Sequence, residues 1–183
     1  MSPTDGADED PVAETGQRLA IAFERIHRER MAGLPILHPD LAVAVVGGCA
    51  WYGHWLGVLV TPWCMNLVLV PAFGSELAHD AQGTKRLLDF PAGQFEFVSS
   101  PLDDLGTIAT CSLFSPMQAF ADQAAAEATA AEVMTALFEP NPDTTAPGQR
   151  DAQAGATGAK SARFRPDPGV SRRDLLRGSF RSG

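Results

Sequence analysis

The chain has 183 residues, of which 45% are hydrophobic and 20% are charged. This balance fits one globular domain with a hydrophobic core and argues against a second full domain. The first 11 residues are acidic and contain neither a basic region nor an apolar stretch, so they do not have the pattern of a secretory signal. We therefore expect a cytoplasmic protein.

The net charge of −8 is unevenly distributed along the chain. There are 18 acidic and 6 basic residues before Pro140, but 4 acidic and 8 basic residues from Pro140 onward. An acidic body is a poor partner for nucleic acid, which it would repel. It would attract a basic segment, either its own tail or part of another protein.

The first predicted element is a helix from Asp10 to about Met31. Asp10 is a typical helix cap, Pro11 suits the first helical position, and Gly33 follows the expected end. Apolar residues then recur at helical spacing, at Leu19, Ala22, Phe23 and Ile26.

Three strands rich in Val and Leu are predicted next, at residues 41–48, 52–60 and 65–73. Residues 41–75 contain no Asp, Glu, Lys or Arg, which by length alone would suit a membrane span. The glycines at 47, 48 and 53, His54 and the Thr61-Pro62-Trp63 segment oppose a continuous spanning helix. We expect strands joined by a turn at Thr61-Pro62-Trp63 and no membrane insertion.

The following segment is predicted to contain a loop, two strands and a helix. Residues 76–89 are polar and suggest a loop with a short helical turn at 85–88, and strands are expected at 90–100 and 105–114. Ser115 is a possible cap, Pro116 a possible first helical residue, and Gln118 completes a capping box. The second helix is therefore predicted to start at Ser115-Pro116 and to end before Pro140.

Together these elements indicate an α+β fold. We expect a mostly antiparallel sheet of about five strands, with an N-terminal and a C-terminal helix packed on it, both on one face. The domain would span residues 1–139, with residues 1–10 as an acidic extension. Residues 140–183 have few large apolar side chains, which predicts a disordered basic tail.

The cysteines and histidines do not form a recognisable reactive or metal-binding motif. Cys49, Cys64 and Cys111 include no C-x-x-C pair, and His27, His38, His54 and His79 share no ligand spacing, so no metal or cofactor is predicted. Residues 158–161 lack the Gly before Lys that a phosphate-binding loop needs. A thiol- or metal-dependent accessory enzyme, using a cysteine with a histidine such as His54, stays open as the alternative function.

Three phrases carry a resemblance to a known family. The stretches WLGVLVTPWCMNLVLVP, FPAGQFEF and CSLFSPM, at residues 55–71, 90–97 and 111–117, resemble the HybE-type family of nickel-iron hydrogenase assembly chaperones. The resemblance implies a non-enzymatic cytoplasmic protein that binds a hydrogenase small-subunit precursor and its twin-arginine signal, delaying export until maturation is complete. The large subunit or other maturation proteins would be further partners. Some relatives carry a rubredoxin domain, but this chain lacks the paired C-x-x-C motifs, so no bound iron is expected.

Large adaptable side chains at strand ends and near the expected helix start are the candidates for client binding. Filling the core is the alternative role for each of them. Trp63 and Met117 are the strongest candidates for exposure at the surface. The full set of candidates is Trp51, Trp55, Trp63, Met65, Asn66, Phe114 and Met117.

The tail carries a second motif, at residues 171–177. The sequence SRRDLLR resembles the twin-arginine consensus S-R-R-x-F-L-K, through Arg172, Arg173, Leu175 and Leu176. Only GSFRSG follows, so the motif lacks the apolar stretch of an export signal. A chance match in a solvated basic tail is one interpretation. The other is a decoy that occupies the chaperone's own signal-binding surface, or engages the export machinery, until a client displaces it.

Overall fold

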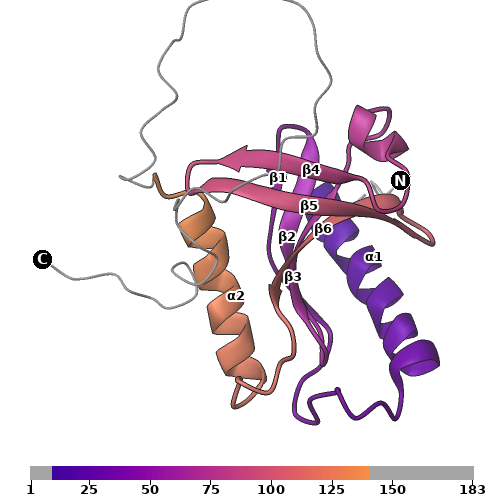
Figure 1. Ribbon diagram of the computed structural model, residues 1–183, viewed down its shortest axis with the longest axis vertical. Helices are drawn as coiled ribbons and strands as arrows, with labels where there is room; N and C mark the ends of the chain where they lie inside the picture. Colours follow the sequence, from indigo (N-terminus) through magenta and orange to yellow (C-terminus); the bar gives the residue numbers. More distant parts are fainter. Residues whose placement is uncertain (1–9, 141–183) are drawn as a thin grey trace, which may run out of the picture.

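The computed structural model describes residues 10–140, and the predictions for the N-terminal extension and the tail lie outside this range (Figure 1). The described chain forms two helices, two short helical turns and six strands. In chain order these are α1 (Pro11–Ile26), η1 (His27–Met31), β1 (Ala44–Trp51), β2 (His54–Val60), β3 (Met65–Val70), η2 (Glu76–His79), β4 (Lys85–Phe90), β5 (Gly93–Leu102), β6 (Gly106–Phe114) and α2 (Gln123–Leu137).

The strands form one antiparallel sheet in the order β1-β2-β3-β6-β5-β4. In Figure 1, β2 and β3 run down the view while β4 and β5 run across its top, so the sheet is strongly twisted. The α+β class and the antiparallel sheet are confirmed. No helix within residues 10–140 is both long and apolar enough to cross a membrane.

The prediction of a loop with a helical turn at residues 85–88 is wrong, because these residues lie in the edge strand β4. Phe90 pairs with Gly93 across a tight turn, and Leu88 pairs with Phe95. The sequence KRLLDF did not suggest a strand because half of its residues are charged. One side of β4 faces solvent, and pairing with β5 outweighs the weak intrinsic strand propensity of these residues.

The two helices differ in how well the sequence predicted their starts. Asp10 caps α1 by accepting a hydrogen bond from the Val12 amide at 3.0 Å, as expected. α2 starts at Gln123 rather than at Ser115-Pro116, and Asp122 is its cap, accepting from the Ala125 amide at 2.8 Å.

Tertiary contacts explain the later start of α2. The Met117 side chain is fully buried in the core, and the Gln118 amide group donates to the Ile36 carbonyl. The Phe120 carbonyl oxygen lies 3.0 Å from His38 Nε2. These contacts hold residues 116–121 against the sheet and the preceding connector, so the helix cannot begin there.

The expectation that both helices cover one face is also wrong. Leu19 of α1 packs with Trp55 and Leu59 of β2, whereas Ala126 and Ala130 of α2 pack with the alternate β2 residues Leu56, Val58 and Val60. Successive side chains of a strand point to opposite faces, so α1 and α2 lie on opposite sides of the sheet, as Figure 1 shows. The uninterrupted apolar run of β2 reflects burial on both faces.

Trp55 is the main contact between α1 and the sheet. Its indole nitrogen donates to the Val12 carbonyl oxygen at 2.9 Å. Its ring lies against three glycines, Gly48 of β1, Gly57 of β2 and Gly16 of α1. A Cβ added at these positions would lie 3.0, 2.7 and 3.6 Å from the nearest ring atom, respectively. The glycines therefore make room for a large ring between two layers.

Substitutions at two of these glycines should have opposite effects on stability. Gly57→Ala would place a Cβ 2.7 Å from the Trp55 ring and 3.2 Å from the Gly48 backbone, and we expect it to lower the free energy of unfolding by about 1–3 kcal/mol. Gly16→Ala, whose Cβ would be 3.5 Å from its nearest neighbour, should leave stability unchanged or raise it by up to about 1 kcal/mol because alanine favours the helix. Urea unfolding of both variants provides the measurement, and equal destabilisation would contradict this account of the Trp55 packing.

Candidate binding surface

One half of the sheet lacks a covering helix on the α1 side. α1 packs on β1 and β2, and its Leu19 shares a buried cluster with Val68 of β3 and Ile108 of β6; the same face of the sheet continues beyond these residues. We name this area the open sheet face, and its residues are Asn66, Leu87, Glu96, Val98, Thr110 and Ser112. All six are partly or fully exposed, and Leu87 reaches 57% exposure.

The opposite face of the same strands is closed. Leu67, Phe95, Phe97 and Cys111 alternate with the open-face residues along β3, β5 and β6, and all four are buried in the core beneath α2. Along β3, β5 and β6, the open-face side chains are therefore partly or fully exposed, whereas the four alternating side chains that point toward α2 are buried. Two of the six open-face side chains, Leu87 and Val98, are apolar, and an exposed sheet face that mixes apolar and polar side chains is a candidate interaction surface.

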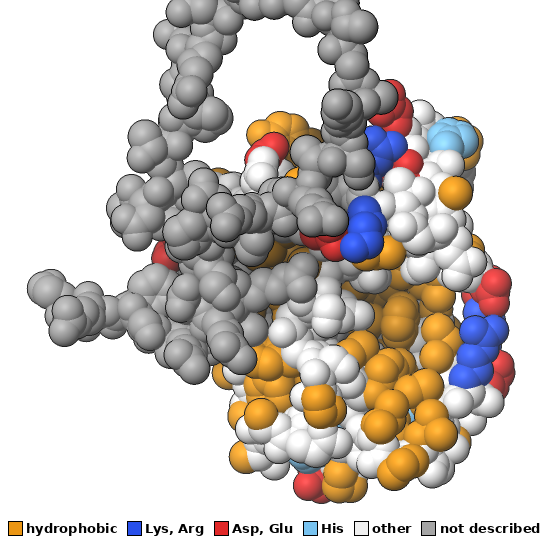
Figure 2. All heavy atoms as spheres, viewed as in Figure 1, with side chains coloured by type: hydrophobic (Ala, Val, Ile, Leu, Met, Phe, Trp, Pro, Cys, Tyr) orange, Lys and Arg blue, Asp and Glu red, His pale blue; other side chains and the backbone are white. Residues whose placement is uncertain are grey.

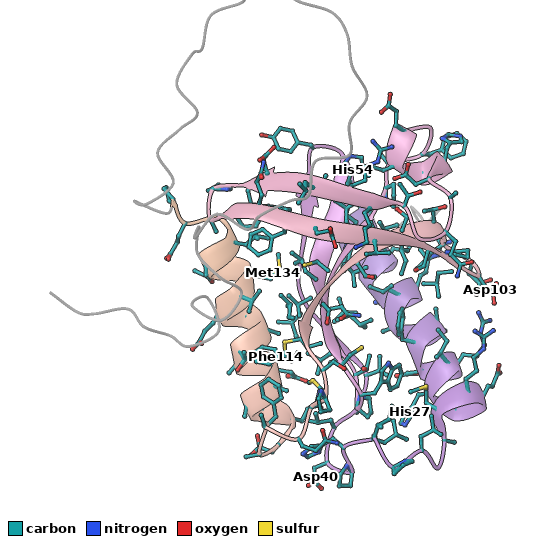
Figure 3. The ribbon with its side chains drawn as sticks, viewed as in Figure 1. His27, Asp40, His54, Asp103, Phe114 and Met134 are labelled. Carbon is teal, nitrogen blue, oxygen red and sulfur yellow. The ribbon has the colours of Figure 1, made fainter. Side chains whose placement is uncertain are left out.

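Charged groups lie on the open sheet face and at its border with α1. On the face itself, Lys85 Nζ lies 3.1 Å from Glu96 Oε1, and both side chains are well solvated. At the α1 border, Arg25 pairs with Asp104 at 3.0 Å, and Arg18 donates to the Asp104 carbonyl oxygen, which ties the β5–β6 turn to α1. Figure 2 shows hydrophobic side chains gathered beside this Arg–Asp cluster, whose position is marked by Asp103 in Figure 3.

The turn between β2 and β3 supplies a second border, and its prediction is confirmed. Thr61 Oγ1 accepts from the Cys64 amide at 2.9 Å and donates to the Cys64 carbonyl at 2.8 Å. The Pro62 carbonyl accepts from the His38 amide at 2.8 Å. These bonds hold the half-buried Trp63 beside the end of α1, where its ring centroid is 5.7 Å from that of His27.

The seven predicted residues do not form one surface. Trp55, Met65 and Met117 are core residues, so the expectation that Met117 offers a surface side chain is wrong. Trp51 stacks on Phe90 at 4.6 Å and Phe114 contacts Phe120 at 5.0 Å, both on the α2 side of the sheet. Figure 3 shows Phe114 beside α2 and His27 at the end of α1. Only Trp63 and Asn66 lie at the open sheet face or its border.

The sequence analysis did not identify five residues of the open sheet face as binding candidates: Leu87, Glu96, Val98, Thr110 and Ser112. The alternation of residues 94–98 contained part of the signal, because Phe95 and Phe97 on one side imply that Glu96 and Val98 lie on the other. Leu87 was hidden because β4 was taken for a loop. The exposure of this face could not be foreseen, since it depends on where α1 lies.

Two of the three cysteines, Cys49 and Cys64, have thiols whose pKa is raised. Burial raises the pKa of the Cys64 thiol, although hydrogen bonds from Thr61 and Asn66 partly oppose this, and burial also raises the pKa of Cys49. Neither thiol is hydrogen-bonded to a histidine within the described chain, and His54 Nδ1 instead accepts from the Ala72 amide at 2.9 Å. Residues 10–140 also contain no group of three or more side chains placed to hold a metal ion.

A raised pKa leaves less thiolate at neutral pH, and the thiolate is the reactive form. We therefore expect Cys64 and Cys49 to react with a thiol reagent at pH 7 more slowly in the folded protein than in the same protein unfolded in urea. Mass spectrometry of the labelled peptides measures each site separately. Fast, selective labelling of either residue at pH 6 in the folded protein would show an activated thiol and favour an enzyme.

Comparisons with known proteins agree on one family. The family model described as NiFe-hydrogenase assembly, chaperone, HybE matches residues 14–178. The chain is 44% identical to the hydrogenase expression/formation protein HupJ of Bradyrhizobium diazoefficiens over 133 residues, which cover 73% of this chain and 76% of that protein. It is 45% identical to HupT of Azotobacter chroococcum over 118 residues, 64% of this chain and 78% of the other.

A solved structure shows the same fold. The solution structure of HybE from Escherichia coli matches with a TM-score of 0.54 and 26% identity, covering 79% of this chain and 91% of that one. The family resemblance noted from three sequence phrases is thereby confirmed. The chain belongs to the HybE family of NiFe-hydrogenase assembly chaperones.

Proposed function

We propose that this protein is a cytoplasmic assembly chaperone that binds a NiFe-hydrogenase small-subunit precursor together with its twin-arginine signal and delays export until maturation is complete. The observation that carries the proposal is the open sheet face, an uncovered half-sheet in a member of a chaperone family. Relatives are named as hydrogenase expression/formation proteins, and the matching family is described as an assembly chaperone family, which supports a role in assembly.

The chemistry of the open sheet face suits a segment with a basic head and an apolar body. Leu87, Val98 and Trp63 offer apolar contacts, and an aromatic side chain at a border is a common binding hot spot. Glu96 and Asp89 lie on the same side of the sheet and offer carboxylates to arginine. Residues 10–140 contain 15 acidic and 6 basic side chains, so the whole body attracts a basic segment.

The alternative of a thiol- or metal-dependent accessory enzyme has less support. The half-buried Cys49 and Cys64 have thiols with raised pKa values, and the histidines nearest to them in sequence, His54 and His38, form hydrogen bonds with the backbone. No observation on the described residues favours an enzyme over a binding protein.

The role of the signal can be tested on the client. We expect the purified chain to bind a hydrogenase small-subunit precursor, and to bind it at least about tenfold more weakly when the paired arginines of the signal are replaced by lysines, because lysine lacks the bidentate fork of arginine. Calorimetry or surface-based binding measures the difference. Equal affinity for both precursors would move the contact to the mature part of the subunit.

The role of the open sheet face can be tested on the chaperone. Trp63→Ala and Leu87→Ser should each weaken precursor binding by at least about tenfold, in the range seen for hot-spot residues. Phe73→Ser is the control, because Phe73 is a fully exposed apolar residue of the loop after β3 and is not one of the residues of this face. Thermal unfolding confirms that each variant is folded, and weakening by the control alone would place the binding surface elsewhere.

A further inference from the structure

We propose that the twin-arginine-like segment of the tail, residues 171–177, binds the open sheet face of its own chain and competes there with the client's signal. The proposal rests on the function proposed above, since it assigns regulation to the same surface. It makes the protein self-inhibited, with the client displacing the tail.

The segment has the chemistry of the ligand that the surface is proposed to bind. It places two adjacent arginines, Arg172 and Arg173, before two leucines, Leu175 and Leu176. The family match extends to residue 178 and so includes the whole segment, which is not an unrelated addition to the chain. Residues 178–183, which follow the motif, include one large apolar side chain, Phe180, so residues 171–183 offer less apolar surface than an export signal and should bind more weakly than a client.

The segment can reach any part of the domain. Residues 141–170 separate it from the end of the described chain, and a stretch of 30 residues spans up to about 100 Å when extended. A domain of this size has a radius of gyration of about 14 Å. Reach therefore does not restrict the segment to the neighbourhood of α2, although the tail leaves the fold there.

Charge favours the encounter, and the open sheet face offers a partner for each part of the segment. The chain from Pro140 onward has 8 basic and 4 acidic residues, against the acidic body. Within residues 10–140 Glu96 forms a solvated ion pair with Lys85, and such pairs contribute little, so an arginine fork can replace the lysine at small cost. Leu87 and Val98 beside it are apolar partners for the two leucines.

Tethering makes a weak contact effective. A flexible linker gives its attached ligand a local concentration in the millimolar range. If the segment binds with a dissociation constant of about 0.1 mM, it lowers the apparent affinity for the client about tenfold. A client with a full apolar stretch can still displace it.

The test uses the full chain and two pairs of tail substitutions. Arg172→Ala with Arg173→Ala removes the motif, and Arg163→Ala with Arg165→Ala removes the same charge from the tail outside it. The amide resonances of Leu87, Val98, Thr110 and Ser112 report tail binding without a client. Titration with a synthetic hydrogenase twin-arginine signal peptide reports competition.

We expect the motif variant, but not the charge-matched control, to shift the open-face resonances and to bind the signal peptide about tenfold more tightly. Unchanged resonances and affinity in the motif variant would overturn the proposal. Equal changes in the control pair would also overturn it, because they would show that the net charge of the tail, and not the motif, causes the effect. If the resonances shift but no form of the chain binds the peptide, the tail contact stands and the proposed client function fails. If all forms bind the peptide equally with no shift, the client function stands and self-inhibition fails.

Discussion

The burial of β2 on both faces is the constraint on which the rest of the structure depends. Leu56, Val58 and Val60 face α2, and Trp55 and Leu59 face α1, so a single uncharged strand carries two hydrophobic layers. Trp55 joins α1 to the sheet, because its ring fills the space above Gly48 and Gly57 and its indole nitrogen donates to the Val12 carbonyl oxygen in the first turn of α1. Charged or bulky residues along this strand would separate one helix from the sheet.

The open sheet face follows from the same arrangement. α1 is positioned by Trp55 and Leu19 over β1 and β2, and the β5–β6 turn is tied to its side through Arg25 and Asp104. One 16-residue helix is too narrow to cover six strands: Val68 of β3 and Ile108 of β6 are buried with Leu19, but the open sheet face beyond them is not covered by a helix of the described chain. The domain thereby has a large core under α2, a smaller core under α1 and a candidate binding surface beside α1.

The candidate site was only partly predictable, for identifiable reasons. Trp63 was found because a Thr-Pro-Trp break inside an apolar run marks a turn, and turns expose their side chains. Met117 was misplaced because the Ser115-Pro116-Met117-Gln118 pattern imitates a helix start, whereas tertiary contacts hold this segment as a buried connector. Leu87 was missed because the half-polar edge strand β4 resembles a loop until its pairing partner is known. Val98 was missed because the exposure of its face of β5 depends on where α1 lies.

The sequence by itself determined the helix cap at Asp10, the turn at Thr61-Pro62-Trp63, the strand-rich body and the family, because these depend on local residue chemistry and on long matching phrases. Only the tertiary structure decided that the helices lie on opposite faces, that β4 completes the sheet and that one half-face is left open. The physical reason is that an uncharged strand has no polar side to show which face is covered. Strand pairing and helix position join residues far apart in the chain, and no local pattern specifies them.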